Sequence, residues 1–400
     1  MKFWVGQAVA VFGAQFSPIA IQFIAIITLN VSPFQLGVLG FLNTAPFIVL
    51  GLFVGVWLDR HSRRRTLLLA DLGRSLVLSV VPLSYLLYTV TLNLLYAVTL
   101  AAGILTVFFE IGYQSYVPSL VDKPKIVEAN RRLEATRSLS QAVGPTVAGG
   151  VCSVIAYPLA VLGDTIGYAA SWVSLALIRK PEAVQRTARR STREEIREGL
   201  ALVFGNRTLR AIAGTNATVN FLSAAFFVLL PIFFVKSLGM NPFEVGLVFG
   251  VGAMGGVLGA LISMRVVKRM GVGATIVMGS VIFSLLSTSF YFVVPGNGVV
   301  VNIILASAIL FTSFVGVLIY NITQVSYRQA LVPKEIQGRM NATIRTLVWG
   351  MIPLGNLTGG AVAEVLGVHQ TIVLMAALAI LSPLWIILSP VRTVSDFPSD

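Results

Sequence analysis

Residues 55–65 read Gly55-Val-Trp-Leu-Asp59-Arg60-His-Ser-Arg63-Arg64-Arg65, a dense cluster of charges between two long apolar segments. A short motif upstream of this cluster, Pro33-Phe-Gln-Leu-Gly37, is matched 209 residues later by Pro242-Phe-Glu-Val-Gly246. The second copy of the cluster is weaker, because Gly55 aligns with Met264 and Asp59 with Lys268. The pattern predicts two related halves, each carrying its own version of this loop.

The composition excludes an ordinary soluble protein. Of the 400 residues 56% are hydrophobic and 11% are charged, whereas soluble domains carry about 25% charged residues. The mean hydropathy is +0.86. Only helices or closed barrels satisfy the backbone hydrogen bonds in lipid, and the apolar runs of about 20 to 28 residues are far longer than a barrel strand. The sequence therefore predicts an all-α membrane protein with twelve transmembrane helices joined by short loops.

Twelve apolar runs are separated by helix breakers and short polar loops. We expect helices near residues 4–29, 34–57, 66–89, 92–118, 133–156, 159–178, 208–235, 243–264, 273–294, 299–325, 339–366 and 371–389. The long polar interval at 179–207 divides them six and six. We therefore predict an N-terminal six-helix bundle at 1–178, a cytoplasmic linker at 179–207, a C-terminal six-helix bundle at 208–390 and a cytoplasmic tail at 391–400.

The linker contains an amphipathic pattern. Thr192-x-x-Glu195 has the spacing of a capping box, and Leu200, Val203 and Phe204 follow on one helical face. We expect a helix that lies on the inner membrane surface and tethers the two halves. A regulatory partner site is the alternative interpretation.

The net charge of +13 is distributed in alternate loops. Lys and Arg gather at 60–65, 123–132, 179–210, 265–269 and 328–339. This alternation follows the positive-inside rule and predicts that both termini lie in the cytoplasm. A nucleic-acid partner is excluded, because the basic residues form no single face with interleaved aromatic residues.

Cysteine and histidine are scarce. A single cysteine, Cys152, excludes an internal disulfide, and two histidines, His61 and His369, leave no Cys/His metal site. The same shortage leaves an intramembrane enzyme without a nucleophile–base pair or a metal set. The first apolar segment is too long for a signal-peptide core, so we expect it to stay attached.

Ionisable residues inside apolar segments are costly in a membrane and indicate functional positions. Asp71 and Arg74 are three residues apart and can pair, either as a structural ion pair or as part of a gating network. Glu110 lies deep in its helix among aromatic residues, and Arg137 lies at a similar depth in the next helix. Glu110 is therefore a candidate for proton coupling or substrate contact, with a static pair as the alternative. Asp164 is a second carboxylate candidate, and its alternative role is a hydrogen bond in helix packing.

The charge cluster resembles the Gly-x-x-x-Asp-Arg-x-Gly-Arg-Arg loop of the major facilitator superfamily of secondary transporters, with Ser62 at the second glycine. Residues 113–121, 128–138 and 337–341 are similar to the bacterial branch that includes macrolide-efflux and enterobactin-exporter relatives. The resemblance covers essentially the whole chain. It implies two pseudo-symmetric six-helix bundles with a binding site near the midplane of the membrane.

The resemblance also implies a cytoplasmic gate. Its residues here are Gly55, Asp59, Arg60, Arg63, Arg64, Asp71 and Arg74. A carboxylate at Asp59 would act as a latch at a helix end, Gly55 would let a neighbouring helix approach closely, and Arg65 would serve topology alone.

Helix five contains Gly144-Pro145-x-x-Ala148-Gly149-Gly150, which resembles a motif that goes with antiporters in this superfamily. A proline bends the helix and small residues allow close helix contact. Plain helix packing is the alternative interpretation.

Helices one, four, seven and ten line the cavity in this fold, so the resemblance also predicts cavity residues. They are Gln15, Gln22, Gln114, Asn216, Asn220, Phe227, Tyr320, Asn321 and Gln324, together with Glu110. This mixture of amides and aromatic rings suits a moderately large, partly hydrophobic substrate better than a sugar.

The resemblance therefore implies a proton-coupled antiporter that exports an amphipathic small molecule, such as a drug, a macrolide-like compound or a siderophore-like compound. We expect a monomer in the bacterial cytoplasmic membrane that contacts lipids, uses the proton gradient and needs no cofactor. Two alternatives stay open: an importer of the same fold, and a transport-inactive receptor or assembly protein. An ATP-driven exporter is excluded, because the chain has no Gly-x-x-x-x-Gly-Lys-Ser/Thr motif.

Overall fold

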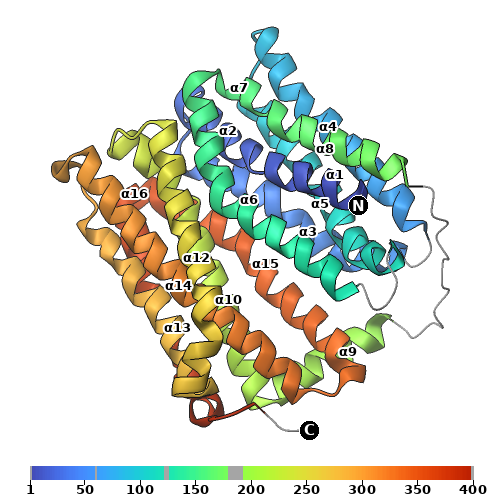
Figure 1. The fold of residues 1–400 in the computed structure, drawn as a ribbon. Coiled ribbons are helices and arrows are strands. Elements are labelled where there is room, and N and C mark those ends of the chain that lie inside the picture. The colour runs from blue at the N-terminus through green and yellow to red at the C-terminus, as the bar shows by residue number, and fades with distance from the viewer. Residues whose placement is uncertain (1, 59–60, 121–125, 179–191, 398–400) are drawn as a thin grey trace. The chain divides into compact units, whose positions relative to one another are not determined.

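The computed structural model describes residues 2–58, 61–120, 126–178 and 192–397. Throughout these ranges the chain forms helices and short connections, without a strand (Figure 1). The predicted all-α fold is confirmed for this part of the chain. Asp59 and Arg60 of the predicted gate lie outside the described residues.

The chain divides into two compact units. The first comprises Met1–Ala188 together with Met240–Gly250, and the second comprises Arg189–Gly239 and Val251–Asp400. This division differs from the predicted boundary at 208 in two places. The start of α12 (Pro242–Met270) belongs to the first unit, and the linker helix α9 (Thr192–Gly205) belongs to the second.

The first unit follows the predicted order of helices. Its elements are α1 (Lys2–Gly13), α2 (Phe16–Phe23), the π-helical segment η1 (Ile24–Thr28), α3 (Pro33–Leu58), α4 (Arg63–Leu86), α5 (Leu92–Leu120), α6 (Ile126–Val154), α7 (Tyr157–Ala160), α8 (Leu162–Ala176) and the beginning of α12 (Pro242–Met270).

The second unit repeats this order after the linker helix. Its elements are α9 (Thr192–Gly205), α10 (Arg207–Phe227), α11 (Leu230–Ile232), the π-helical segment η3 (Phe233–Ser237), the rest of α12, α13 (Val272–Ser287), η4 (Thr288–Phe292), η5 (Pro295–Asn297), α14 (Val299–Leu331), α15 (Lys334–Leu366), α16 (Val368–Ala379), α17 (Leu384–Ile387) and η6 (Pro390–Thr393).

Ten helical segments among the described residues are long and apolar enough to cross a membrane. Two of the twelve predicted spans, α6 and α15, are not among them, although they are 29 and 33 residues long. Both begin with several charged residues that extend the helix beyond the apolar run, and the rest of each helix contains many glycine and polar residues, which lower its hydropathy. These polar starts also explain why α6 and α15 begin at 126 and 334 rather than near 133 and 339.

The repeated motif at 33–37 and 242–246 lies at the N-termini of α3 and α12, where the same hydrogen-bonded cap is formed. At the start of α3 the Ser32 amide donates to Oε1 of Gln35 at 2.9 Å, and the Gln35 amide donates to Oγ of Ser32 at 3.3 Å. At the start of α12 the Asn241 and Glu244 amides are satisfied in the same reciprocal way, at 2.8 and 3.0 Å. Each is a capping box, which satisfies two amides that the helix leaves free.

The chain before these two caps repeats as well. A five-residue π-helical segment precedes each, at Ile24–Thr28 and at Phe233–Ser237. Each is followed by a residue with a positive φ angle, Asn30 at 49° and Gly239 at 69°. Glycine and asparagine tolerate this left-handed backbone better than other residues. The repeat therefore encodes a sharp turn before α3 and another before α12.

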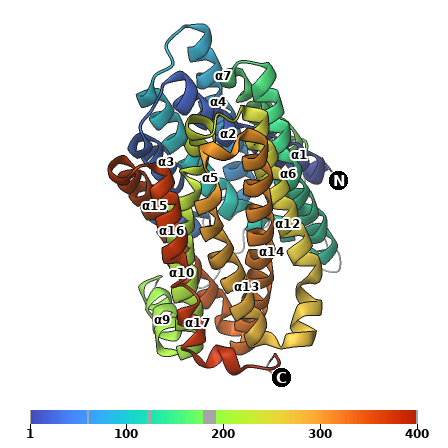
Figure 2. The same cartoon turned by 90° about the vertical axis from the view of Figure 1, so that its left-hand side faces the viewer.

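The linker helix α9 packs against the start of α15, within the second unit. Val203 is fully buried among residues of α10 and α15, and a Cβ on Gly199 would overlap Thr343. Glu198 forms an ion pair with Arg339 of α15, while Leu200 and Phe204 are exposed. The predicted helix is therefore present, and protein contacts hold one of its faces (Figure 2).

Close helix contact in the second unit depends on glycine at the packing of α13 against α14. A Cβ on Gly279 would lie 2.8 Å from the carbonyl oxygen of Gly316 and 2.8 Å from the amide of Tyr320. Both are backbone atoms, so they cannot move aside without separating the helices.

We expect Gly279→Ala to destabilise the protein by about 1–3 kcal/mol, since overpacking at a tight contact costs that much. Gly51→Ala is the matched control, because a Cβ at Gly51 of α3 meets no atom within 4 Å. The control should be neutral or stabilising, since alanine favours a helix over glycine by about 1 kcal/mol. Thermal unfolding in detergent measures both, and equal midpoints would contradict this view of the contact.

Candidate functional site

The centre of the first unit holds a buried ion pair between Asp71 and Arg74, both on α4. The two side chains are 0% and 4% exposed, and Nη2 of Arg74 donates to Oδ1 of Asp71. The other carboxylate oxygen of Asp71 accepts a hydrogen bond from Oγ of Ser171 on α8 at 2.6 Å, and Nε2 of Gln7 on α1 donates to that hydroxyl oxygen at 2.8 Å. Three helices are thus joined through one carboxylate.

Two aromatic rings enclose the guanidinium of Arg74. Its Cζ atom lies 4.0 Å from the ring centroid of Phe109 on α5 and 4.0 Å from that of Tyr168 on α8. Such cation–π contacts stabilise a desolvated guanidinium, by about 2 kcal/mol or more each. Nε of Arg74 is buried and has no hydrogen-bond partner among the described residues. The guanidinium therefore keeps one unused donor.

Asp164 is a second buried carboxylate of this unit. It stands in the first turn of α8 and is 3% exposed. Phe16 and Ser17, in the first turn of α2, lie beside it, and Arg74 is the cation close enough to act on its charge. Its Oδ1 atom is buried with no hydrogen-bond partner among the described residues. The hydroxyl and amide of Ser17 and the amide of Phe16 are close enough to act on the carboxylate as hydrogen-bond donors. The unused oxygen therefore belongs to a carboxylate that has donors on its other side, in the unit where Arg74 has one unused donor.

Small residues bring α8 close to the break between α1 and α2. A Cβ on Gly13 would lie 2.7 Å from the carbonyl oxygen of Gly163, and a Cβ on Gly163 would lie 2.7 Å from the ring of Phe16. A Cβ on Gly167 would similarly approach the backbone of Ala10 at 3.2 Å. This packing places Asp164 beside the first turn of α2, whose free amides and dipole favour negative charge.

Glu110 and Arg137 are not an ion pair in the described part of the chain. Glu110 is half-buried on α5, and Arg137 is exposed on α6. Both are close enough to Tyr113 to act on its hydroxyl group, and the ring of Tyr113 stacks on Phe109 and on Phe3, with centroids 6.0 and 5.8 Å apart. The static pair considered for Glu110 is therefore absent from this structure, and its role in coupling stays a prediction.

The described part of the arginine loop caps a helix. Arg64 donates to the carbonyl oxygens of Leu175 at 3.3 Å and Ala176 at 2.9 Å, which satisfies the C-terminal end of α8. Arg63 and Arg65 also lie in the first turn of α4, whose N-cap is Ser62. A Cβ on Gly55 would meet no atom within 4 Å among the described residues, and the close helix approach expected there stays a prediction.

The antiporter-like segment of α6 makes a close contact with the start of α12. A Cβ on Gly149 would overlap the carbonyl oxygen of Pro242, and a Cβ on Gly246 would overlap that of Pro145. Oγ1 of Thr146 donates to the carbonyl oxygen of Gly246 at 3.2 Å. This contact explains why residues 240–250 belong to the first unit.

The other two glycines of the segment differ from each other. A Cβ on Gly144 would overlap the side chain of Gln15, so these two residues fit together closely, whereas Gly150 has only a ring carbon of Phe243 nearby, at 3.6 Å. The amide of Gln15 donates to the carbonyl oxygen of Val11 at 3.2 Å, one turn earlier in α1. Gln15 is therefore engaged within its own unit.

The remaining predicted cavity residues occupy different environments. Asn216, Tyr320 and Gln324 are buried within the second unit, while Asn321 is exposed. Gln22, Asn220 and Phe227 are half-buried, and Phe227 stacks on Phe314 with centroids 5.8 Å apart. The side chain of Gln114 lies outside the described residues. A cavity formed by the whole set stays a prediction.

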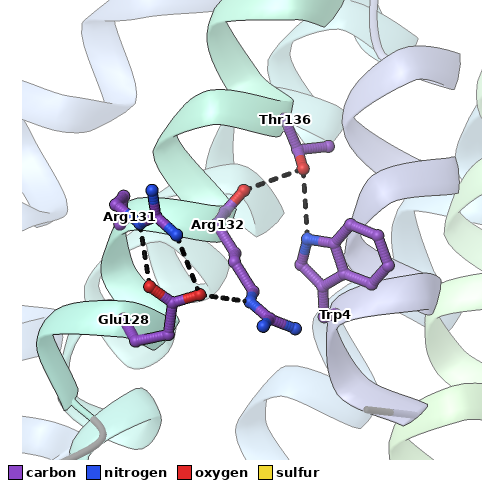
Figure 3. A network of polar contacts seen from close by, with 5 residues as sticks. All are labelled: Trp4, Glu128, Arg131, Arg132 and Thr136. Atoms are coloured by element: carbon purple, nitrogen blue, oxygen red, sulfur yellow. Dashed lines mark hydrogen bonds and ion pairs between the residues drawn. The ribbon is translucent and has the colours of Figure 1, made fainter.

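A charged network follows α5 at the start of α6 (Figure 3). Glu128 accepts hydrogen bonds from Arg131 at 2.8 Å and Arg132 at 2.7 Å, which lower the pKa of its carboxyl to about 2. Nε1 of Trp4 donates to Oγ1 of Thr136 at 3.1 Å and so fastens α1 to α6.

In the described residues, no group of three or more His, Cys, Asp or Glu side chains gathers as a metal site.

The sequence model described as "Major Facilitator Superfamily" matches residues 3–355. The chain belongs to this superfamily. It is 22% identical over 379 residues to macrolide efflux protein A of Streptococcus pyogenes, covering 94% of this chain and 92% of the relative. It is 25% identical to the multidrug efflux pump Tap of Mycolicibacterium fortuitum over 354 residues, covering 86% and 84%.

A solved structure shares the fold of this superfamily member. It is a bacterial homologue of the human lysosomal transporter Spinster, crystallised in an inward-facing and occupied conformation. The TM-score is 0.72 at 13% identity, over 97% of this chain and 95% of the other. The chain is thus a multi-pass membrane transporter rather than an enzyme.

The sequence identified the acidic and basic members of this transporter's buried network and missed their partners. Asp71, Arg74 and Asp164 stand out because they are ionisable residues in apolar runs. Gln7 and Ser171 resemble ordinary polar residues in a helix, and a single buried network across three helices has no signature at fixed spacing. Helical periodicity within α8 offers the one usable signal, because Asp164, Tyr168 and Ser171 share a face.

We expect Arg74→Gln to destabilise the protein by about 3–5 kcal/mol, because it leaves the Asp71 carboxylate buried without a cation. The double variant Asp71→Asn with Arg74→Gln should lose less, since no uncompensated charge remains. Thermal unfolding in detergent separates the two. Arg131→Gln is the control, because its exposed pair with Glu128 is worth about 0.2–1 kcal/mol. A double variant less stable than Arg74→Gln alone would rule out an explanation by the buried charge pair.

Proposed function

We propose that this transporter is a proton-driven exporter of amphipathic small molecules in the bacterial cytoplasmic membrane. Likeness to efflux proteins along nearly the whole chain is the observation that carries the proposal. The proposal includes twelve membrane spans, of which α6 and α15 are the two more polar ones. It also places both termini in the cytoplasm and assumes transport by alternating access. The alternation of basic loops supports that orientation.

The coupling carboxylate belongs in the first unit, and Asp164 is the best candidate there. It is 3% exposed, and one of its oxygens has no hydrogen-bond partner among the described residues. The charged form of such a group is expensive to bury, while the protonated form is not. Glu110 is the runner-up, because it is half-buried and reaches water more easily.

Arg74 gives Asp164 a means of alternating between two states. Arg74 on α4 and Tyr168 on α8 are close enough to interact with the charge of Asp164. Asp71 and Glu110 act in the same way on Tyr168. While Arg74 pairs with Asp71, Asp164 has no bonded cation to offset the cost of burying its negative charge, which favours its protonated form over its ionised form. If the guanidinium turns its unused Nε donor towards Asp164, that carboxylate can release the proton. One arginine shared by two carboxylates would thus couple proton release to a small movement of α8 against α4.

The class of substrate follows from the relatives rather than from a single pocket. Their names specify macrolides and multiple drugs, which are large and partly hydrophobic compounds. Aromatic residues such as Phe226 and Phe227 suit such compounds, and sugars need more hydrogen-bonding groups than these helices supply. We therefore propose macrolide-like compounds as the first group to test.

The test is reconstitution into liposomes that contain a pH-sensitive dye. Addition of a macrolide outside should make the lumen more alkaline, because an antiporter exchanges the entering substrate for a lumenal proton. Asp164→Asn should abolish the dye response while exchange of labelled macrolide across the membrane continues. Glu134→Gln is the matched control, since Glu134 is an exposed carboxylate of the same unit.

Each alternative has its own outcome in this assay. An acidified lumen would indicate a symporter, and no response with any compound would support a transport-inactive receptor. A response that survives in Asp164→Asn and disappears in Glu110→Gln would move the coupling site to Glu110. Retained macrolide exchange shows that a silent variant is folded.

A further inference from the structure

A cavity of about 930 Å³ lies at one end of the second unit, where α10 begins and α17 ends. Residues of α10, α17 and η6 line it, and α17 lies at the same end of the unit as α9 (Figure 2). This cavity contains none of the residues that the proposed transport mechanism uses.

Three arginines line the cavity: Arg207 and Arg210 from α10, and Arg392 from η6. Among the described residues that line this cavity there is no aspartate or glutamate. Nη1 of Arg210 donates to the carbonyl oxygen of Phe204 at 3.3 Å, and the guanidinium has further N–H donors beyond this one. The three side chains are exposed. They form a concentrated positive site without a protein anion among the lining residues.

The opposite side of the cavity is apolar. Leu381, Leu384, Trp385 and Leu388 line it, and each is an exposed hydrophobic side chain, Leu388 at 82%. The indole of Trp385 lies against α10 at Gly214, where a Cβ would come within 2.7 Å of the ring. A fixed indole next to basic residues is typical of the boundary between lipid tails and head groups.

We propose that this cavity binds an anionic phospholipid, with the phosphate on the three arginines and an acyl chain along Leu381, Leu384 and Leu388. Arginine suits the phosphate, because its planar donor fork binds two oxygens at once. Basic pockets between membrane helices bind anionic lipid head groups by this chemistry. The ligand is independent of what the protein transports.

The arginines carry this site, and the helix N-terminus of α10 does not. Oδ1 of the N-cap Asn206 already accepts hydrogen bonds from the amides of Thr208 at 2.9 Å and Leu209 at 3.2 Å. A free phosphate could use the same three arginines, but it would gain nothing from the leucines. The apolar wall is therefore what distinguishes a lipid from a soluble anion.

Trp385 provides the measurement, because brominated acyl chains quench nearby tryptophan fluorescence. Full-length protein in detergent is titrated with dibrominated phosphatidylglycerol and, separately, with dibrominated phosphatidylcholine. Trp385→Phe identifies the part of the quenching that comes from this site. We expect phosphatidylglycerol to quench that part at much lower concentration than phosphatidylcholine.

Replacement of the arginines gives the decisive comparison. Each Arg→Gln change should weaken phosphatidylglycerol binding about fivefold, and the triple variant roughly a hundredfold, at about 1 kcal/mol per basic residue. A triple Arg→Lys variant should bind with intermediate affinity, because it keeps the charge and loses the fork. The control removes three charges at the end of α12 in the same unit, by Arg265→Gln, Lys268→Gln and Arg269→Gln, and should bind normally.

Three results would overturn the proposal. The first is equal quenching by both lipids, and the second is an equal loss of affinity in the control triple variant. The third is displacement of the lipid by millimolar inorganic phosphate, which would make this a soluble-anion site. Leu384→Asn distinguishes lipid binding from binding of a soluble anion, since it should weaken binding of the lipid and leave binding of inorganic phosphate unaffected. Size-exclusion profiles that match wild type show that the variants are folded.

Discussion

The guanidinium of Arg74 must be neutralised inside the first unit, and much of that unit is arranged around it. A charge in a low-dielectric interior is tolerated only with a partner and with its hydrogen bonds satisfied. Asp71 supplies the charge, Phe109 and Tyr168 supply two aromatic faces, and Ser171 fixes the carboxylate. Helices α1, α4, α5 and α8 are therefore held in register by polar contacts, in an environment where apolar surface gains little from association.

The need to satisfy backbone hydrogen bonds is the second constraint, and it explains where the two halves of the sequence resemble each other. A helix that starts near a membrane boundary leaves amides unpaired, and the reciprocal caps at Ser32–Gln35 and Asn241–Glu244 satisfy them. The repeat visible in the sequence is mostly a repeat of these caps and of the turn before them. Residues away from such caps can differ in identity between the two halves of the sequence.

Helix positions were predictable because a membrane demands long apolar runs, and the described helices lie within a few residues of the predicted ones. The ends of α6 and α15 were less predictable, since a helix can continue through charged residues beyond the apolar run. Gln7, Ser171 and Tyr168 were missed because their significance comes from three-dimensional proximity to Asp71 and Arg74.

The second unit lacks the charge that organises the first. At the repeat offset of 209 residues, Asp71 corresponds to Ser280, Arg74 to Phe283 and Gln7 to Asn216. Ser284 and Ser382 share a hydrogen bond of 3.2 Å, and Thr215 donates to the Ser382 carbonyl oxygen at 3.3 Å, so neutral groups join the corresponding helices here. A hydroxyl network packs helices without changing its charge, whereas one arginine with two carboxylates can take up and release a proton. Under the proposed function the proton chemistry therefore lies in the first unit, while hydroxyl groups join the corresponding helices of the second unit.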